Sequence, residues 1–255
     1  MNLIALDNVS FAYGRGRTIL DGVSLSVTAG RNLGIVGESG SGKTTMLRLL
    51  LGLIRPSAGT VRFRGAALDD GDRAGLRRFR RAVQAVFQDP YSSLDPRQRV
   101  VDIIAEPLRS LGIEADIATT VAAVLAAVGL PPEAARRYPH EFSGGQRQRI
   151  AIARAIVADP EVVLADEVVS ALDLSTRIRI VELLKTLSAR MSLVLVSHDI
   201  GFVALVADDL VILERGRIVE QGPTRQVLSR PAHAYTRRLL DSTPRLPTFS
   251  QSATA

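Results

Sequence analysis

The segment that decides the fold is Gly37-Glu38-Ser39-Gly40-Ser41-Gly42-Lys43-Thr44, a glycine-rich run that ends in Lys-Thr. The apolar residues 33–36 before it favour a short buried strand, and residues 45–51 after it favour a helix. In this strand–loop–helix context the glycines let backbone N–H groups approach phosphate oxygens, and the helix directs its positive dipole end at the same anion. The sequence therefore predicts a phosphate-binding loop.

Each residue of this loop is a candidate contact for a nucleotide: Gly37, Glu38, Ser39, Gly40, Ser41, Gly42, Lys43, Thr44 and Thr45. Lys43 supplies a mobile positive charge for the β and γ phosphates. The Thr44 hydroxyl can be a ligand of the Mg²⁺ ion that bridges them. The alternative, a Gly/Ser-rich surface turn, is disfavoured by the predicted strand before the loop and the predicted helix after it.

A pair of carboxylates follows a second apolar segment, residues 161–165. This segment predicts a strand in the middle of a parallel sheet, ending at the edge where such sheets bind ligands. Because side chains alternate along a strand, we expect Asp166 and Glu167 to face opposite sides. We assign Asp166 to Mg²⁺, held through water, and Glu167 to the general base that polarises the attacking water. Without the phosphate loop, two solvated loop carboxylates would be the better interpretation.

A second glycine-preceded helix is predicted by Phe142-Ser143-Gly144-Gly145-Gln146 and the apolar spacing of residues 147–157. The N-terminus of such a helix can bind a phosphate. Because the chain already has a complete phosphate loop, the natural ligand of this segment is the nucleotide held by another copy or by a partner. Ser143 would contribute a hydroxyl and Gly145 an unobstructed N–H, with Gly144 and Gln146 beside them.

Together these motifs resemble the nucleotide-binding subunit of an ATP-binding cassette (ABC) transporter, and the resemblance runs nearly end to end. It implies ATP and Mg²⁺ as cofactors and ATP hydrolysis coupled to transport across a membrane. It also implies an α/β fold, with a P-loop NTPase core built on a parallel sheet, an N-terminal antiparallel β layer and an inserted α-helical subdomain at about residues 89–150. The ATP-binding domain would span residues 1–243, followed by a flexible tail, 244–255.

The resemblance implies roles for four further residues. Tyr13 would stack on adenine, and Gln88 would sense Mg²⁺ and the γ-phosphate while connecting the core to the helical subdomain. Asp173, in Ser170-Ala171-Leu172-Asp173, belongs to a loop that crosses a dimer interface. His198 would contact the γ-phosphate and orient the catalytic water. Taken alone, Tyr13 would be an ordinary strand aromatic and His198 a structural residue.

Three segments, 86–97, 138–142 and 230–236, resemble the peptide and nickel importer group of this family. The group implies two membrane-spanning permeases, a second cassette subunit in a homo- or heterodimer, and an extracytoplasmic substrate-binding protein. It also implies a peripheral position on the cytoplasmic face of the inner (plasma) membrane, with di- or oligopeptides or chelated nickel as cargo. Val168 and Phe142 depart from the residues usual in the group, although neither holds a charged or phosphate-contacting position.

Other functions fit the sequence less well. The net charge of +6 and the basic run 73–81 suggest nucleic-acid binding, but the run has one aromatic residue, Phe79, and no recognised reading module. A solvated helix face, or contact with anionic lipid or a permease, explains the run better, so no nucleic acid is expected. A soluble cassette protein acting on ribosomes or DNA repair complexes usually has two cassettes or a long coiled-coil insertion, and this sequence shows neither. A regulatory subunit would have a degenerate ATP site, whereas Lys43, Asp166, Glu167 and His198 are intact here.

The remaining elements follow from local patterns. Residues 3–65 are β-rich, residues 100–111 and 117–128 predict helices of the inserted subdomain, 210–220 a β-hairpin and 225–240 a pair of helices. The sequence contains no run of about 18 apolar residues that could cross a bilayer. It contains no cysteine, which excludes an iron–sulfur cluster held by cysteines.

Overall fold

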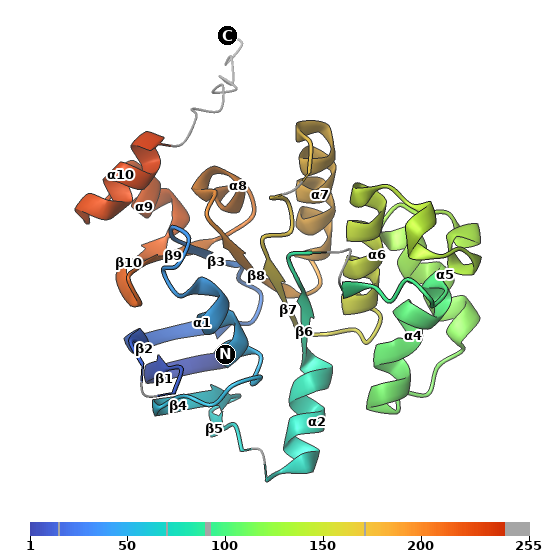
Figure 1. Ribbon diagram of the computed structural model, residues 1–255, viewed down its shortest axis with the longest axis horizontal. Helices are drawn as coiled ribbons and strands as arrows, with labels where there is room; N and C mark the ends of the chain where they lie inside the picture. Colours follow the sequence, from blue (N-terminus) through green and yellow to red (C-terminus); the bar gives the residue numbers. More distant parts are fainter. Residues whose placement is uncertain (15, 70, 90–92, 171, 243–255) are drawn as a thin grey trace.

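Two β-sheets and the helices that cover them make up this protein (Figure 1). The computed structural model describes residues 1–14, 16–69, 71–89, 93–170 and 172–242. The predicted tail, 244–255, lies outside these ranges. The predicted α/β fold, with an antiparallel layer beside a largely parallel sheet, is confirmed.

The smaller sheet is antiparallel, with the strand order β2-β1-β4-β5. Its strands are β1 (Asn2–Ala12), β2 (Thr18–Thr28), β4 (Ala58–Phe63) and β5 (Ala66–Ala67). Alternate residues of β2, such as Val23, Leu25 and Val27, are buried. They share a hydrophobic core with Met46 and Leu49 of helix α1 (Lys43–Leu50). This sheet therefore covers one side of the helix that follows the phosphate loop.

The larger sheet has the strand order β10-β9-β3-β8-β7-β6. Its strands are β3 (Leu33–Val36), β6 (Val83–Val86), β7 (Val162–Asp166), β8 (Ser192–Ser197), β9 (Asp209–Glu214) and β10 (Arg217–Pro223). All pairs are parallel except β9 with β10, which forms the predicted hairpin. Every residue of β3, β7 and β8 is buried, as expected for continuous apolar strands covered on both faces.

Helices pack on both faces of this sheet. Val162 and Leu164 of β7 belong to the core that contains α1, whereas Val163 and Ala165 belong to a second core on the other side. Helices α7 (Leu174–Leu187) and α8 (Ile200–Ala204) contribute to that second core. Helix α8 approaches β3 so closely that a Cβ atom on Gly34 would lie 2.1 Å from Val203 Cγ1. The short helices α9 (Thr224–Ser229) and α10 (Ala234–Ser242) follow β10.

The inserted helices lie to one side of the sheets, at the right of Figure 1. They are α4 (Val100–Leu111), α5 (Ile117–Ala127), the 3₁₀ turns η1 (Pro132–Arg136) and η2 (Pro139–Glu141), and α6 (Gly144–Ile156). Helix α4 ends at Gly112, which has a φ of 57°, and α5 ends one residue earlier than predicted, before Val128 and Gly129. A glycine with left-handed backbone conformation just after the last turn, here Gly112 or Gly129, is a common end of an α-helix.

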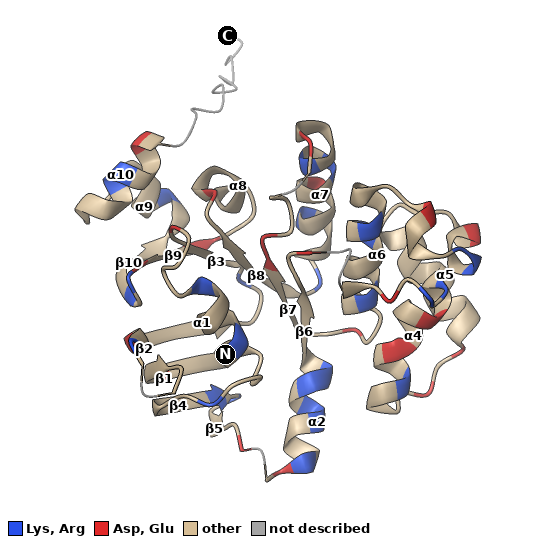
Figure 2. Ribbon diagram, in the orientation of Figure 1, with Lys and Arg blue, Asp and Glu red and all other residues tan. Residues whose placement is uncertain are grey.

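The basic run forms helix α2 (Arg73–Ala82), whose ribbon carries the colour of Lys and Arg over much of its length in Figure 2. The Asp72 carboxylate caps the helix by accepting a hydrogen bond from the Gly75 N–H. Phe79 and Ala82 are buried, and the arginines of the helix are exposed. The run is therefore a solvated helix face with one apolar anchor. Among the described residues, no helix has the length and hydrophobicity to span a bilayer.

Candidate nucleotide site

A cavity of about 740 Å³ lies at the carboxyl ends of β3, β7 and β8. It brings together residues that are far apart in the sequence. The predicted site residues in its lining are Tyr13, Glu38, Ser39, Gly40, Gly42, Lys43, Thr44, Thr45, Gln88, Asp166, Glu167 and His198. Ile19, Leu239 and Ser242 also line it, although no motif in the sequence marks them as site residues.

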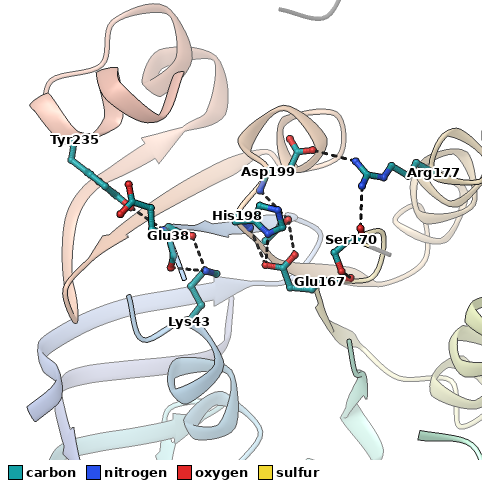
Figure 3. A network of polar contacts seen from close by, with 10 residues as sticks. Glu38, Lys43, Glu167, Ser170, Arg177, His198, Asp199 and Tyr235 are labelled. Atoms are coloured by element: carbon teal, nitrogen blue, oxygen red, sulfur yellow. Dashed lines mark hydrogen bonds and ion pairs between the residues drawn. The ribbon is translucent and has the colours of Figure 1, made fainter. Parts of the chain in front are cut away.

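The phosphate loop is closed around the ammonium group of Lys43. Lys43 Nζ donates hydrogen bonds to the backbone oxygens of Gly37 (2.7 Å) and Glu38 (2.9 Å). Figure 3 shows the Lys43 side chain beside Glu38. Only 7% of Lys43 is exposed, and burial lowers its pKa, opposed by the negative charges of Glu167, Asp166 and Glu38. An ammonium group has three protons, so one remains for a ligand in the cavity.

The first glycine of the loop packs against the sheet and does not line the cavity. A Cβ atom on Gly37 would lie 2.3 Å from the backbone oxygen of Leu213 in β9 and 2.7 Å from Ser41 Oγ. Ser41 is also buried, and its hydroxyl has no hydrogen-bond partner among the described residues. Gly37 and Ser41, both predicted to contact the nucleotide, therefore support the loop from the side away from the cavity. Gly42, with a φ of 108°, directly precedes the first residue of α1.

Asp166 has the environment of a cation ligand. It is 5% exposed, and within the described part of the chain its Oδ1 atom has no hydrogen-bond partner. Burial, with a smaller contribution from Glu167, raises the pKa of Asp166 to about 6, against the opposing charges of Lys43 and Arg48. Thr44 and Gln88 line the same cavity. This set of hard oxygen donors, with one buried carboxylate, suits Mg²⁺, which prefers few carboxylates together with substrate phosphates.

Glu167 is turned toward His198 (Figure 3). Its Oε1 atom lies 2.9 Å from His198 Nδ1 and accepts a hydrogen bond from the His198 backbone N–H at 3.1 Å. The expected alternation between Asp166 and Glu167 was wrong, because both side chains line the cavity. The physical reason is that β7 ends at Asp166 and that Glu167 has a φ of 47°, which redirects its side chain. Left-handed backbone in a non-glycine residue costs about 1–3 kcal/mol and clusters at functional sites.

Tyr13 and Gln88 lie at the rim of the cavity. Tyr13 is 50% exposed, its ring meets Phe11 edge to face at 4.8 Å, and its hydroxyl accepts a hydrogen bond from Arg48. A hydrogen bond with Thr45, and then Arg48, lowers the pKa of Tyr13. Tyr13 is thus both half exposed and part of the cavity lining. Gln88 lines the cavity just before residues 90–92, which lie outside the described ranges.

The second glycine-preceded helix does not reach this cavity. Ser143 and Gln146 form a capping box at the start of α6, in which Gln146 Oε1 accepts from the Ser143 N–H at 3.0 Å and Ser143 Oγ accepts from the Gln146 N–H at 3.4 Å. Neither these residues nor Gly144 and Gly145 are among the lining residues. Ser143 is exposed. The motif therefore presents a capped helix N-terminus to the outside of the molecule.

Asp173 also lies outside the cavity, at the start of α7. Its carboxylate accepts hydrogen bonds from Ser175 Oγ and Thr176 Oγ1, both at 2.7 Å, and from the Thr176 N–H at 3.0 Å. These bonds hold the pKa of Asp173 well below its usual range. A Cβ atom on Gly145 would lie 2.5 Å from Thr176 Cγ2, so the Asp173 loop and the glycine motif of α6 are neighbours. Ala171 lies outside the described residues.

Comparison with known families identifies this set of motifs. The sequence model of the ABC transporter family matches residues 20–170, which is well over half of the chain. The chain belongs to the ABC transporter family. The model of the oligopeptide/dipeptide transporter C-terminal region matches residues 219–252. The predicted resemblance to this family and to its oligopeptide-type group is confirmed.

The curated ABC relatives include importer subunits. The glutathione import ATP-binding protein GsiA of Escherichia coli K12 is 48% identical over 226 residues, which cover 87% of this chain and 36% of GsiA. GsiA of Salmonella typhi is 47% identical over 229 residues, which cover 88% of this chain and 37% of that protein. The chain thus spans about a third of the length of these relatives.

Solved structures of ABC proteins share the fold. CbiO1 from Clostridium perfringens, part of the ABC transporter complex CbiONQ, superposes with a TM-score of 0.80 at 26% identity, covering 90% of this chain and 91% of its own. The ATP-binding cassette MJ0796, a dimer bound to ADP and Pi after hydrolysis, superposes with a TM-score of 0.78 at 31% identity, covering 88% of this chain and 99% of its own.

The burial of Asp166 leads to a stability prediction. Its pKa is about 6 against the usual 3.8, so between these pH values the folded chain retains a proton that the unfolded chain has lost. Stability therefore falls as pH rises through this window, by an amount that corresponds to about 3 kcal/mol at most. We expect Asp166→Asn to raise the unfolding free energy of the nucleotide-free chain at pH 7.5, and to remove this slope.

Urea denaturation between pH 4.5 and 8 measures this effect as the difference between variant and parent. The matched control is Glu114→Gln, which neutralises an exposed carboxylate in the loop after α4 and should leave the slope unchanged. A difference between Asp166→Asn and the parent that stays constant with pH would show that the Asp166 charge is not destabilised by burial.

Proposed function

We propose that this chain is the ATP-binding and ATP-hydrolysing subunit of an ABC importer. The observation that carries the proposal is that one cavity combines the phosphate loop, the buried Asp166 oxygen that has no hydrogen-bond partner among the described residues, and the Glu167–His198 pair. These groups supply what hydrolysis of a nucleoside triphosphate requires: a phosphate cradle, a ligand for the cation, and a base beside the reacting phosphate.

Within the cavity, binding and orientation come from the loop. The loop residues that line the cavity, among them Gly40, Gly42 and Thr44, and the third proton of Lys43 Nζ would hold the β and γ phosphates, and the Tyr13 ring would stack on adenine. Thr44, Gln88 and, through water, Asp166 would hold Mg²⁺. When bound, Mg²⁺ neutralises charge that develops on the phosphate oxygens.

The chemical step would be carried by Glu167. Its carboxylate accepts a proton as a water oxygen forms a bond to the γ phosphorus and the bond from that phosphorus to the ADP oxygen breaks, which yields ADP and inorganic phosphate. The contacts of His198 with Glu167 Oε1 orient this base, and the exposed His198 ring would contact the γ-phosphate. Ser170 Oγ supports the same turn by donating to the Glu167 backbone oxygen at 2.9 Å.

A second cassette would complete the site. Ser143, Gly144, Gly145, Gln146 and Asp173 lie outside the cavity of their own chain, which is the arrangement required if they meet the nucleotide of a partner. The dimeric state of MJ0796, which is 31% identical to this chain, supports this proposal. ATP would then close two cassettes face to face, and hydrolysis would let them separate.

The transport role rests on the family and on the relatives. The oligopeptide/dipeptide match at residues 219–252 and the identity to glutathione importers favour a small peptide, such as glutathione or a di- or oligopeptide, as cargo, and chelated nickel is the other candidate. Closure of the cassettes would pull on two permeases supplied with cargo by an extracytoplasmic binding protein. The chain would lie on the cytoplasmic face of the inner membrane.

Capture from membranes tests this proposal. The tagged chain, gently solubilised with ATP and Mg²⁺, should retain two multi-span permeases and a cassette subunit that mass spectrometry can identify, and capture with ADP is the matched control. Reconstituted with those permeases in vesicles, the complex should take up a labelled peptide only with ATP. Ribosomal or DNA repair proteins without permeases would contradict the transport role and support a soluble ABC ATPase.

A further inference from the structure

A tyrosine near the C-terminus contacts the phosphate loop from outside the cavity. The hydroxyl of Tyr235, in α10, accepts a hydrogen bond from the backbone N–H of Glu38 at 2.9 Å (Figure 3). Only 2% of Tyr235 is exposed, and burial raises its pKa. The two residues are 197 positions apart, so the contact joins the last described helix to the loop after β3.

This contact holds one end of a peptide group whose other end is held by Lys43. The Gly37 carbonyl and the Glu38 N–H belong to the same planar trans peptide and point in opposite directions. Lys43 Nζ donates to the carbonyl at 2.7 Å, while Tyr235 accepts from the N–H. Rotation of this peptide would break both bonds. The Tyr235 hydroxyl therefore fixes the direction in which the Gly37 carbonyl meets the lysine ammonium.

Helix α10 is itself anchored to the sheet. The Glu220 carboxylate of β10 accepts hydrogen bonds from the backbone N–H groups of Ala232 (2.9 Å) and His233 (3.0 Å) and from Thr236 Oγ1. Burial acts to raise the pKa of Glu220, and these hydrogen bonds outweigh it and lower the pKa. Three hydrogen bonds thus tie the segment that carries Tyr235 to one strand, so the tyrosine is held on a fixed support.

The same helix borders the nucleotide cavity. Leu239 lies one turn after Tyr235 and Ser242 lies at the end of the helix, and both line the cavity together with the phosphate loop. Arg238 extends over the Tyr235 ring, with its guanidinium carbon 5.6 Å from the ring centroid, and contacts Glu214 at 3.4 Å. Helix α10 is therefore a wall of the cavity as well as a support for the loop.

We infer that Tyr235 is a positioning residue for the phosphate loop, through which the C-terminal segment sets the affinity of this chain for ATP. The inference rests on the proposed function, that the loop binds ATP. Tyr235 lies within residues 219–252, which match the model of the oligopeptide/dipeptide transporter C-terminal region. This region would therefore contribute to nucleotide binding. The ligand class is a nucleoside triphosphate, and the contact acts on the loop and not on the phosphates.

Tyr235→Phe tests this inference, because it removes one oxygen and keeps the buried ring. We expect the Kd for ATP, measured on the full chain with a fluorescent ATP analogue, to rise about five-fold, as expected for one hydrogen bond. Hydrogen exchange at the Glu38 amide should become faster in the nucleotide-free protein. The matched control is Tyr138→Phe, which removes a hydroxyl that contacts Arg99 at 3.5 Å on the helical subdomain. It should change neither quantity.

A purely structural role would give a different pattern. Tyr235→Phe would then lower the melting temperature and leave both the Kd and the exchange of Glu38 as in the parent, a result that would overturn the inference. Failure of the proposed function is distinguishable, because the unaltered chain would bind no ATP. That result would remove the basis of the inference as well. The inference is supported if the Kd of Tyr235→Phe rises while its melting temperature falls no further than that of Tyr138→Phe.

Discussion

Glu167→Gln is expected to reduce the rate of ATP hydrolysis by about 1,000-fold and to leave ATP bound, because the amide cannot accept the proton of the attacking water. The geometry of the site should persist. Glu167 Oε1 accepts from the His198 backbone N–H at 3.1 Å, and the amide oxygen of glutamine can accept the same bond. Phosphate release at saturating ATP measures the loss of turnover, and gel filtration with ATP and Mg²⁺ should reveal a stable dimer of cassettes.

Glu161→Gln is the matched control for this variant. Glu161 directly precedes β7, at the opposite end of the strand from the cavity, where its carboxylate contacts Arg64. The same chemical change there should alter turnover less than about two-fold, since exposed ion pairs contribute little. If Glu167→Gln hydrolysed ATP within ten-fold of the parent rate, Glu167 would not be the base. His198 would then be the next residue to test.

Much of the architecture could be predicted because it depends on local patterns. The largely apolar segments 33–36 and 161–165 predicted buried strands, and β3 and β7 are buried along their whole length. The helix predicted at 100–111 has those bounds, since its spacing is regular and Gly112 ends it. In both cases the signal lies within a few residues of the element that it determines.

Other features depend on contacts that no local pattern carries. The side-chain direction of Glu167 could not be predicted from strand alternation, because a single left-handed residue ends the alternation after Asp166. The contribution of α10 to the cavity could not be predicted either. The Tyr235 contact with Glu38 spans 197 residues, and the sequence near Tyr235 predicted only a helix. Such contacts follow from the packing of the sheet and the chain path.

Ser143→Asp is expected to abolish most hydrolysis, by about 100-fold or more, and to leave ATP binding by the isolated chain unchanged. Aspartate is as good an N-cap as serine, and a negative charge at a helix N-terminus is favourable, so α6 should remain as stable as in the parent. In the closed dimer, however, the new carboxylate would face the γ-phosphate of the nucleotide held by the partner. Two like charges at close range in a site with little water repel strongly.

Ser143→Asn separates the charge from the loss of the hydroxyl. Asparagine caps the helix equally well and is neutral, so we expect its turnover to fall by less than about ten-fold. Both variants should bind the fluorescent ATP analogue like the parent, because Ser143 is not among the residues that line the cavity of its own chain. Equal turnover in the two variants would mean that no phosphate approaches Ser143, whereas weaker ATP binding by the isolated Asp variant would place its site within one chain. Only a nucleotide shared between two cassettes predicts normal binding, normal stability and a loss of hydrolysis that follows the charge.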